Sequence, residues 1–555
     1  MDDPMTGAPT ASNEDRLVSR LLDAVLREDL WGWRTRGTVR PGARGAMLAS
    51  PGGDLALPVQ RGLTADWVTR APELERRGAV VRGLHPVLDA LEPLVDPQDR
   101  DGFSAWREEC AAALRADDAL SSRRERALRR IRGRSSADVH RRALVDESAA
   151  AHLGHPVYPT GSARTGLSEA EDDAYGPESL PSFPLRWFSV DRAALDGTIH
   201  EGALPNWWPV LDGDRFALPS HPLMADRLAE PALRPMPEAP PLLVTPTLSM
   251  RTVAVDRDPS WSLKVPVPTA TLGTRNRRLV SLGSLRDGAA GEILLRRVLS
   301  ADPAWRSRVL HADEQSFGGL RGRDDATVLL RRNPAQPSAA RVVSVAALPA
   351  TSLRTARPVI CELAAHMDAT VPALFGEVCT LIFDFSVWLY ARGIALEAHQ
   401  QNISLIAEPG HPLRLLLKDN DGLRVLPDRL RLPAGAERPA FDDGRIIVDS
   451  VEPLRHLVTT ITVHLVAGML AVALADAGIA DRDTLLRIAA AAFEDAVDRV
   501  GGEAARELRE GIIDSARWPV KAMVTAGTLL SKERSGALDV NKHYVDGPNY
   551  LFGAR

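Results

Sequence analysis

The sequence predicts an α+β protein in three parts. Apolar residues at helical spacing over 17–26, preceded by Asn13 as a capping residue, indicate a helical N-terminal part (1–165) with a short disordered start. Over 166–357, proline and glycine break up short apolar runs, which is typical of β-strands. Over 358–555, helical patterns return and are interrupted by one hairpin, so this part is expected to be mainly helical. A chain of 555 residues is too long for one hydrophobic core, which favours several subdomains.

The charge balance gives no reason to expect nucleic acid as a partner. The chain carries 68 Lys and Arg residues against 73 Asp and Glu residues. Its most basic stretch, SSRRERALRRIRGR (121–134), has acidic residues nearby and is expected to be a solvated helix face. The three cysteines, Cys110, Cys361 and Cys379, are far apart and lack metal-type spacing, which suits a reducing compartment.

No segment predicts insertion into a membrane. Residues 1–16 are polar and acidic, without the basic start and apolar centre of a signal peptide, so a cytoplasmic protein is expected. The one stretch of nearly membrane length, Leu457 to Ala475, contains threonines, a histidine and a glycine. A buried helix in a large core is therefore the better interpretation of this stretch.

Polar residues flank a predicted β-hairpin in the C-terminal part. The apolar runs ISLIA (403–407) and LRLLLK (413–418) are joined by EPGHP, whose proline and glycine favour a chain reversal. Antiparallel pairing would bring together the polar residues at the open end, namely Glu397, His399, Gln401, Asn402, Lys418 and Asp419. Two carboxylates and an amide oxygen suit Mg²⁺, and protein kinases place metal-binding residues in a comparable way. A solvated hairpin end is the alternative interpretation.

A second group of residues suits an oligophosphate, because hydroxyl, guanidinium and ammonium groups follow one another closely. Its members are Ser249, Arg251, Thr252, Lys264 on a predicted strand, and Arg275, with Arg277 and Arg278 as competitors for the last position. The chain contains neither a GxxxxGK[ST] loop nor a strand–GxGxxG–helix unit. A nucleotide site in this chain would therefore be of another kind.

A third polar segment is the loop GHPVYPTGSARTGL (154–167). Its prolines fix an irregular backbone that holds His155, Tyr158 and Arg164 in relation to one another. A histidine can orient or polarise a reacting carboxylate, and an arginine can bind one through two parallel hydrogen bonds. A purely structural His-Pro loop is the alternative interpretation.

These segments occur in the order found in one protein family. GHPVYPTGSARTG resembles the motif GHPxHPxxKxRxG, TPTLSMRTV a segment S-x-R-T, EAHQQN the motif EaHgQN, and LLKDNDGLRV the segment RDfgG. LKVPVPTATLGTR resembles the lysine strand and following arginine of the same proteins. Over roughly residues 147–425 the chain is therefore similar to the NRPS-independent siderophore synthetases, the aerobactin-synthetase-like IucA/IucC family.

This resemblance implies a cupped-hand fold, with a helical thumb, β-rich fingers and a mainly helical palm corresponding to the three parts above. It implies ATP-dependent condensation of a polycarboxylate, such as citrate, a citrate derivative or a dicarboxylic acid, with an amine, hydroxylamine or alcohol. The acid would form an acyl-adenylate, and AMP and pyrophosphate would be released. Family members are often dimers, so a homodimer is one expectation for the assembly.

The resemblance also implies residue roles, which transfer position by position. The triphosphate would be held by Ser249, Arg251, Thr252, Lys264 and Arg275, with Gln401 and Asn402 completing the polar shell around ATP. Glu397 and Asp419 would bind Mg²⁺. His155 and His399 would lie near the reacting carboxylate, and Arg164 would help to bind the acid.

The chain departs from the family motifs at Tyr158 for a histidine, Ser162 for a lysine, Lys418 for an arginine and Asn420 for a phenylalanine. Loss of the loop lysine predicts either an acid with fewer carboxylates than citrate or compensation by another arginine. A catalytically inactive binding relative is one alternative function. A kinase-like phosphotransferase is another, although the kinase signatures HRD and DFG are absent.

Overall fold

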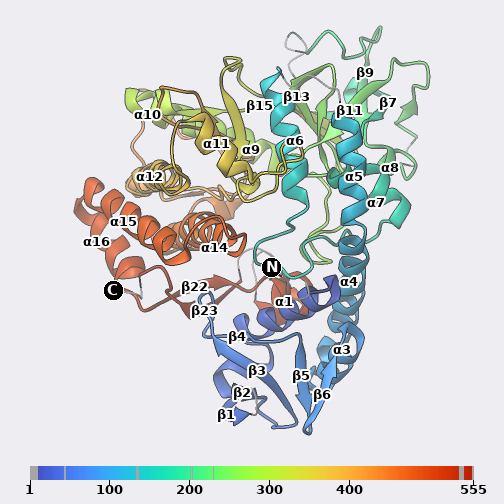
Figure 1. The fold of residues 1–555 in the computed structure, drawn as a ribbon. Coiled ribbons are helices and arrows are strands. Elements are labelled where there is room, and N and C mark those ends of the chain that lie inside the picture. The colour runs from blue at the N-terminus through green and yellow to red at the C-terminus, as the bar shows by residue number, and fades with distance from the viewer. Residues whose placement is uncertain are drawn as a thin grey trace, which may run out of the picture.

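The computed structural model describes residues 11–42, 45–132, 137–199, 202, 204–228, 231–536 and 543–552. Figure 1 shows an N-terminal sheet with its helices, a large middle sheet, and a mainly helical C-terminal part. The long helices α4 and α5 run along one side, from the N-terminal sheet toward the middle sheet. The C-terminal strands β22 and β23 lie between the C-terminal helices and the N-terminal part.

The N-terminal part begins with helix α1 (Asn13–Arg27), whose apolar face is buried as the spacing predicts. Ser12 rather than Asn13 caps it, because the Ser12 hydroxyl accepts the amide N–H of Asp15 at 3.0 Å. The other N-terminal helices are α2 (Trp33–Arg36), α3 (Leu84–Leu91), α4 (Arg100–Asp118), α5 (Leu120–Ile131) and α6 (Val139–Ala151).

This part also contains a six-stranded antiparallel sheet that the expectation of a helical region omitted. Its strands are β1 (Thr38–Gly42), β2 (Gly45–Ala49), β3 (Leu55–Arg61), β4 (Trp67–Thr69), β5 (Glu73–Arg76) and β6 (Ala79–Arg82). Strands β1, β4 and β6 have no fully buried residue, and none of these three gives an alternating apolar pattern. Met523, Val524 and Leu529 complete the core here, so the end of the chain packs on its beginning.

The middle part is a nine-stranded sheet in the order β10-β7-β11-β12-β13-β16-β15-β8, with β9 beside β7. The strands are β7 (Phe183–Asp191), β8 (Leu195–Thr198), β9 (Arg215–Ser220), β10 (Arg234–Pro235), β11 (Leu242–Pro246), β12 (Thr252–Val255), β13 (Asp258–Lys264), β15 (Asp313–Leu320) and β16 (Thr327–Arg332). The associated helices are α7 (Glu169–Tyr175), α8 (Pro222–Ala225), α9 (Leu282–Ser300) and α10 (Pro303–Arg308). Helix α9 packs on β15, which places its residues beside the site described below.

The C-terminal part surrounds a four-stranded sheet of β14 (Val309–His311), β20 (Arg414–Leu417), β19 (Ile403–Ala407) and β17 (Arg341–Ser344). Two small sheets pair β18 (Ile394–Ala395) with β21 (Arg424–Val425), and β22 (Arg517–Lys521) with β23 (Tyr544–Pro548). The helices are α11 (Val359–His366), α12 (Val371–Tyr390), α13 (Glu452–Leu457), α14 (Met469–Asp476), α15 (Arg482–Val500), α16 (Gly502–Leu508) and α17 (Lys532–Ser535). Strand β23 comes from the segment NKHYVDGPNY near the end of the chain, of which Asn541 and Lys542 lie outside the described residues.

Between α13 and α14 the chain forms an 11-residue π-helix, η10 (Val458–Gly468), all of it buried. The stretch from Leu457 to Ala475 lies in this region and is part of a core, as predicted. By length and composition two described helices, Val371–Tyr390 and Glu452–Asp476, could cross a membrane, but 83% of the apolar window in the second is buried inside the protein. Burial of that kind is typical of a core helix.

Candidate functional site

The predicted hairpin is confirmed, and it sets the position of the site. Strands β19 and β20 pair antiparallel with Ile403 opposite Leu417, and the Lys418 amide donates to the Asn402 carbonyl at 3.2 Å. The residues on either side of the hairpin therefore meet, and a small hollow is lined by Glu397, Asn402, Lys418 and Asp419. A Cβ at Gly422 would lie 2.6 Å from Glu397 Oε2, so the glycine leaves the space that this carboxylate occupies.

Asp419 lies at the centre of this site and is held in an unusual backbone conformation. Its φ is 56°, in the left-handed region, and its amide N–H donates to the Glu314 carboxylate at 3.1 Å. Its Oδ1 lies 2.6 Å from Lys264 Nζ and 2.9 Å from Arg331 Nη2. Burial opposes ionisation, but the charges of Lys264 and Arg331 outweigh it and hold the pKa of Asp419 well below its usual value.

The predicted phosphate-binding residues Arg251, Thr252 and Lys264 come together on neighbouring strands. Thr252 on β12 is opposite Lys264 on β13, and the Val265 amide donates to the Arg251 carbonyl at 2.8 Å. The Arg251 guanidinium donates to the Leu279 carbonyl at 2.7 Å. Burial lowers the pKa of Arg251 and outweighs the opposing effect of the Asp419 and Asp421 carboxylates.

Ser249 lies in the tight turn between β11 and β12, where its carbonyl accepts the Thr252 amide at 2.9 Å. The carboxylate of Glu147, on α6, ties this turn to the hairpin: it accepts the Leu248 amide at 2.9 Å and lies 3.2 Å from Lys418 Nζ. Lys418 thus contributes to holding the two polar segments together.

The structure separates the three arginines that competed for one position. Arg275 donates to the carbonyls of Ala526 at 3.0 Å and Thr528 at 3.1 Å, so it anchors the C-terminal segment. Arg277 is exposed. The Arg251 guanidinium donates to the carbonyl of Leu279, the residue after Arg278, and burial, with a contribution from the charge of Arg251, lowers the pKa of Arg278 to about 9. Arg278 is therefore a second candidate, beside Arg275, for the phosphate-binding group.

The two predicted histidines, His155 and His399, lie near each other with the same ring nitrogen occupied. His155 Nδ1 accepts the amides of Val157 at 3.1 Å and Tyr158 at 2.9 Å, and His399 Nδ1 accepts the Gln401 amide at 3.3 Å. Burial is the main reason why both histidines have a lowered pKa: that of His399 is about 4, and that of His155 is well below its usual value. Both rings are therefore neutral at pH 7 and carry their proton on Nε2, which is the donor left for a ligand.

The Glu397 carboxylate lies 3.3 Å from the Nζ atom of Lys521. Lys521 is the last residue of β22 and is buried. Gln401 and Asn402 are half-buried beside Glu397 and the hairpin. Within the described ranges, no three His, Cys, Asp or Glu side chains converge to form a ready-made metal cage. Two carboxylates with an amide oxygen still match what Mg²⁺ takes in nucleotide sites, where it keeps water and phosphate oxygens as further ligands. The donor set at this hollow therefore fits a magnesium nucleotide.

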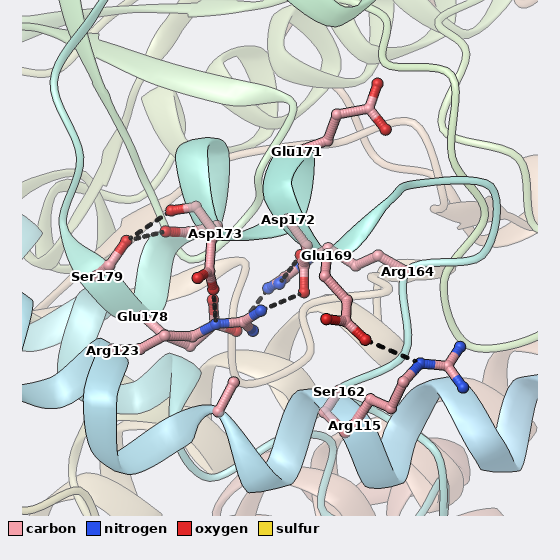
Figure 2. Close-up of polar contacts among 12 residues, drawn as sticks. Arg115, Arg123, Ser162, Arg164, Glu169, Glu171, Asp172, Asp173, Glu178 and Ser179 are labelled. Atoms are coloured by element: carbon pink, nitrogen blue, oxygen red, sulfur yellow. Dashed lines mark hydrogen bonds and ion pairs between the residues drawn. The ribbon is translucent and has the colours of Figure 1, made fainter.

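Arg164 does not lie in this group, and the expectation that it binds the acid is replaced by a structural role (Figure 2). Its guanidinium donates to Asp172 at 2.6 Å and to Glu178 at 2.6 Å, both buried. Arg123 joins the same network, pairing with Asp172 at 2.7 Å and Asp173 at 2.8 Å. Arg123 is therefore buried in an ion-pair network, whereas Glu125, Arg129 and Arg132 of the same segment are exposed, as expected for a solvated helix face.

Ser162 is also directed away from the polyanion site. Its hydroxyl donates to the Ala113 carbonyl of α4 at 3.4 Å, and Figure 2 shows it against this helix. The expectation of an acid with fewer carboxylates, or of a compensating arginine, therefore stays a prediction. Tyr158 is fully buried, with its hydroxyl 3.4 Å from that of Thr528.

Sequence reasoning did not single out Glu314, Arg331 or Asp421. Glu314 and Arg331 form a buried pair at 2.5 Å on neighbouring strands, and both hold Asp419. Asp421 follows Asp419 by two residues, and burial raises its pKa. The segment KDND contained a signal for Asp421, whereas Glu314 and Arg331 lie in strands without a distinctive motif.

Two family models match the chain. The IucA / IucC family model matches residues 145–350, and the model described as ferric iron reductase FhuF-like transporter matches residues 373–535. The rhizobactin siderophore biosynthesis protein RhbC of Rhizobium meliloti is 28% identical over 74% of this chain and 77% of its own length. The chain is therefore similar to the IucA/IucC family over residues 145–350 and to RhbC over most of its length. Staphyloferrin B synthase of Staphylococcus aureus is 27% identical over 51% of this chain and 54% of its own length.

Solved structures share the fold over nearly the whole chain. Petrobactin biosynthesis protein AsbB of Bacillus anthracis superposes with a TM-score of 0.73 at 16% identity, covering 97% of this chain and 95% of that one. ATP-bound aerobactin synthetase IucA of Klebsiella pneumoniae superposes with a TM-score of 0.68 at 18% identity, covering 97% and 99% of the two chains. The expected α+β fold is therefore confirmed.

Proposed function

We propose that this protein is an ATP-dependent ligase that activates a polycarboxylate and joins it to an amine, hydroxylamine or alcohol. The observation that carries the proposal is that Lys264, paired opposite Thr252, lies 2.6 Å from Asp419, which lines one hollow with Glu397. Cations grouped around two carboxylates suit a magnesium triphosphate, whose charge must be neutralised for attack at phosphorus.

In this proposal the chain supplies positioning and charge rather than a protein nucleophile. Lys264, Arg251 and Arg278 would hold phosphate oxygens, with Ser249 and Thr252 adding hydroxyl donors. Glu397 and Asp419 would hold Mg²⁺, which supplies charge neutralisation, and Gln401 and Asn402 would complete the polar shell. Binding would move Lys264 from Asp419 to phosphate, which frees the carboxylate for the metal.

His155 and His399 would orient the reacting carboxylate, because each offers an Nε2–H donor while remaining neutral. The substrate carboxylate oxygen would attack the α-phosphorus of ATP, releasing pyrophosphate and giving an acyl-adenylate. The nitrogen or oxygen nucleophile would then attack the acyl carbon and release AMP. We further propose that the protein acts in siderophore biosynthesis, in the cytoplasm and as a homodimer. Light scattering on the purified protein would test whether it is a dimer.

Product analysis of ATP turnover tests this function. The protein would be incubated with ATP, Mg²⁺, hydroxylamine and one of citrate, 2-oxoglutarate, succinate or a single-carboxylate acid. AMP, pyrophosphate and a hydroxamate that appear with one acid are the expected result. ADP and phosphate would indicate a kinase-like phosphotransferase instead, and turnover that no acid stimulates would indicate a non-catalytic binding relative.

A further inference from the structure

Helix α1 is docked, through the side chain of Arg20, on the loop that carries His155. Arg20 Nη2 donates to the His155 carbonyl at 2.6 Å and to the Tyr158 carbonyl at 2.7 Å. The guanidinium is always charged, and charged donors form stronger hydrogen bonds than neutral ones. Arg20 therefore holds both ends of the backbone stretch 155–158 from outside the loop.

The ring of His155 is fixed to the same stretch of backbone. Its Nδ1 accepts the amides of Val157 at 3.1 Å and Tyr158 at 2.9 Å, which leaves the proton on Nε2. The loop also closes tightly on itself, because a Cβ at Gly161 would lie 2.5 Å from the His155 backbone nitrogen. His155 is half-buried, so the residue keeps exposed surface for a ligand. The direction of the Nε2–H bond thus follows the position of backbone 155–158, which Arg20 holds.

The far end of the loop is tied to helix α4 and to the candidate site. The Thr160 hydroxyl donates to the buried carboxylate of Glu109, on α4, at 2.7 Å. Thr165 forms an antiparallel bridge with Ala270, and its amide donates to the Ala270 carbonyl at 3.0 Å. Ala270 follows Lys264, the last residue of β13, by six positions. The loop is therefore joined at one end to the segment after the lysine strand, and helices α1 and α4 hold the part that presents His155.

We propose that Arg20 is a positioning residue, which holds the loop so that the Nε2–H of His155 points at the reacting carboxylate of the acid. Arg20 would act through His155 and would touch neither the acid nor ATP. The inference rests on the proposed ligase function for the role of His155, whereas the hold on the loop is a property of the protein alone. Both contacts use the single atom Nη2, so a lysine ammonium, with three donors, should replace them in part.

Hydrogen–deuterium exchange of the free protein tests the hold on the loop. The variants are Arg20→Met, which removes the donors, Arg20→Lys, and the control Arg16→Met. Arg16 is exposed on α1 and donates to the Ala11 carbonyl at 2.6 Å. In the peptide 154–162, the amides that the His155 ring accepts should exchange about tenfold faster in Arg20→Met than in the wild type.

Arg20→Lys should exchange at an intermediate rate, and Arg16→Met should match the wild type. Equal exchange in Arg20→Met and the wild type would overturn the proposal. If Arg20→Met does not fold, Arg20→Gln, which keeps one neutral donor on a shorter stem, takes its place with the same expected outcome.

Kinetics test whether Arg20 acts through His155. With the acid that turns over, initial rates of pyrophosphate release should show kcat/KM for the acid about tenfold lower in Arg20→Met, with the KM for ATP changed less than about twofold. His155→Asn keeps an oxygen acceptor for the loop amides but removes Nε2–H. In that background Arg20→Met should lower kcat/KM no further. A full additional loss there, or a parallel rise in the KM for ATP, would indicate a general structural role and overturn the proposal.

The two measurements separate this inference from the ligase function. If no acid supports turnover by the wild type, the proposed function fails and exchange alone decides the role of Arg20. Faster exchange in Arg20→Met than in Arg16→Met would then support Arg20 as the anchor of the loop, and equal exchange would refute it. If the wild type is active and Arg20→Met exchanges faster with an unchanged kcat/KM, the ligase function stands and the positioning role is refuted.

Discussion

Replacement of Asp419 by asparagine should reduce stability and abolish activity for separable reasons. The carboxylate lies 2.6 Å from Lys264 and 2.9 Å from Arg331, and at an effective dielectric constant of about 20 each attraction is worth about 6 kcal/mol. Desolvation offsets most of this gain, so removing one partner of such a cluster costs about 3–5 kcal/mol. Asp419→Asn should therefore lower the free energy of unfolding by about that amount, since two largely buried cations would then face a neutral amide.

The double variant Lys264→Met/Asp419→Asn tests this reasoning directly. Arg331 keeps Glu314 as a partner at 2.5 Å, whereas Asp419 is the one ion-pair partner of Lys264 among the described residues. Removing both charges should recover at least about 2 kcal/mol of the loss, while turnover remains absent because the metal ligand is missing.

Urea unfolding of the two variants and the wild type would measure these differences, provided that the transition slopes are equal. Asp325→Asn is the matched control, because it breaks an accessible pair with Arg323 and should cost no more than about 1 kcal/mol. The coupling between Asp419 and Lys264 would be refuted if the free energy of unfolding of Asp419→Asn lay within about 1 kcal/mol of the wild-type value. It would also be refuted if the double variant were no more stable than Asp419→Asn.

Three further predictions follow from the same geometry. Lys264→Met should raise the KM for ATP about 10- to 140-fold in steady-state assays, corresponding to about 1.5–3 kcal/mol for a charged hydrogen bond, and an unchanged KM would remove this lysine from the phosphate site. Arg164→Gln should lower stability by about 3–5 kcal/mol with no change in the KM for the acid, in contrast to the exposed Arg115→Gln, and a selective rise in that KM would restore a substrate role. Burial lowers the pKa of His464 to about 3, so as pH falls from about 6.5 toward 3 the unfolded chain binds a proton that the folded protein does not, and stability falls. His464→Gln should reduce this dependence by up to about 1.4 kcal/mol per pH unit in unfolding measured across that range, and an identical slope would show that His464 is not neutral in the fold.

The sequence predicted those features of the site that depend on residues close together in the chain. The Pro-Gly turn between two apolar runs predicted the hairpin, and its antiparallel register necessarily brought Asn402, Lys418 and Asp419 together. The placement of Lys264 on a strand was predicted in the same way, and its pairing opposite Thr252 follows from a short hairpin connection. The stretch from Leu457 to Ala475 was recognisable as core because its polar residues suit a packed protein interior.

What the sequence by itself determined is the set of chemical groups, their order and the class of fold that presents them. Only the tertiary structure decided which carboxylates Arg123 and Arg164 pair with, because arginines of one residue type differ only in the side chains that the fold places around them. Other contacts join residues that are far apart in the sequence: Glu314 is 105 residues from Asp419, and Val524 is 496 residues from Glu28. Long-range packing rather than local preference sets those distances, since a guanidinium is pulled toward whichever unsatisfied carboxylate or carbonyl the fold brings within reach.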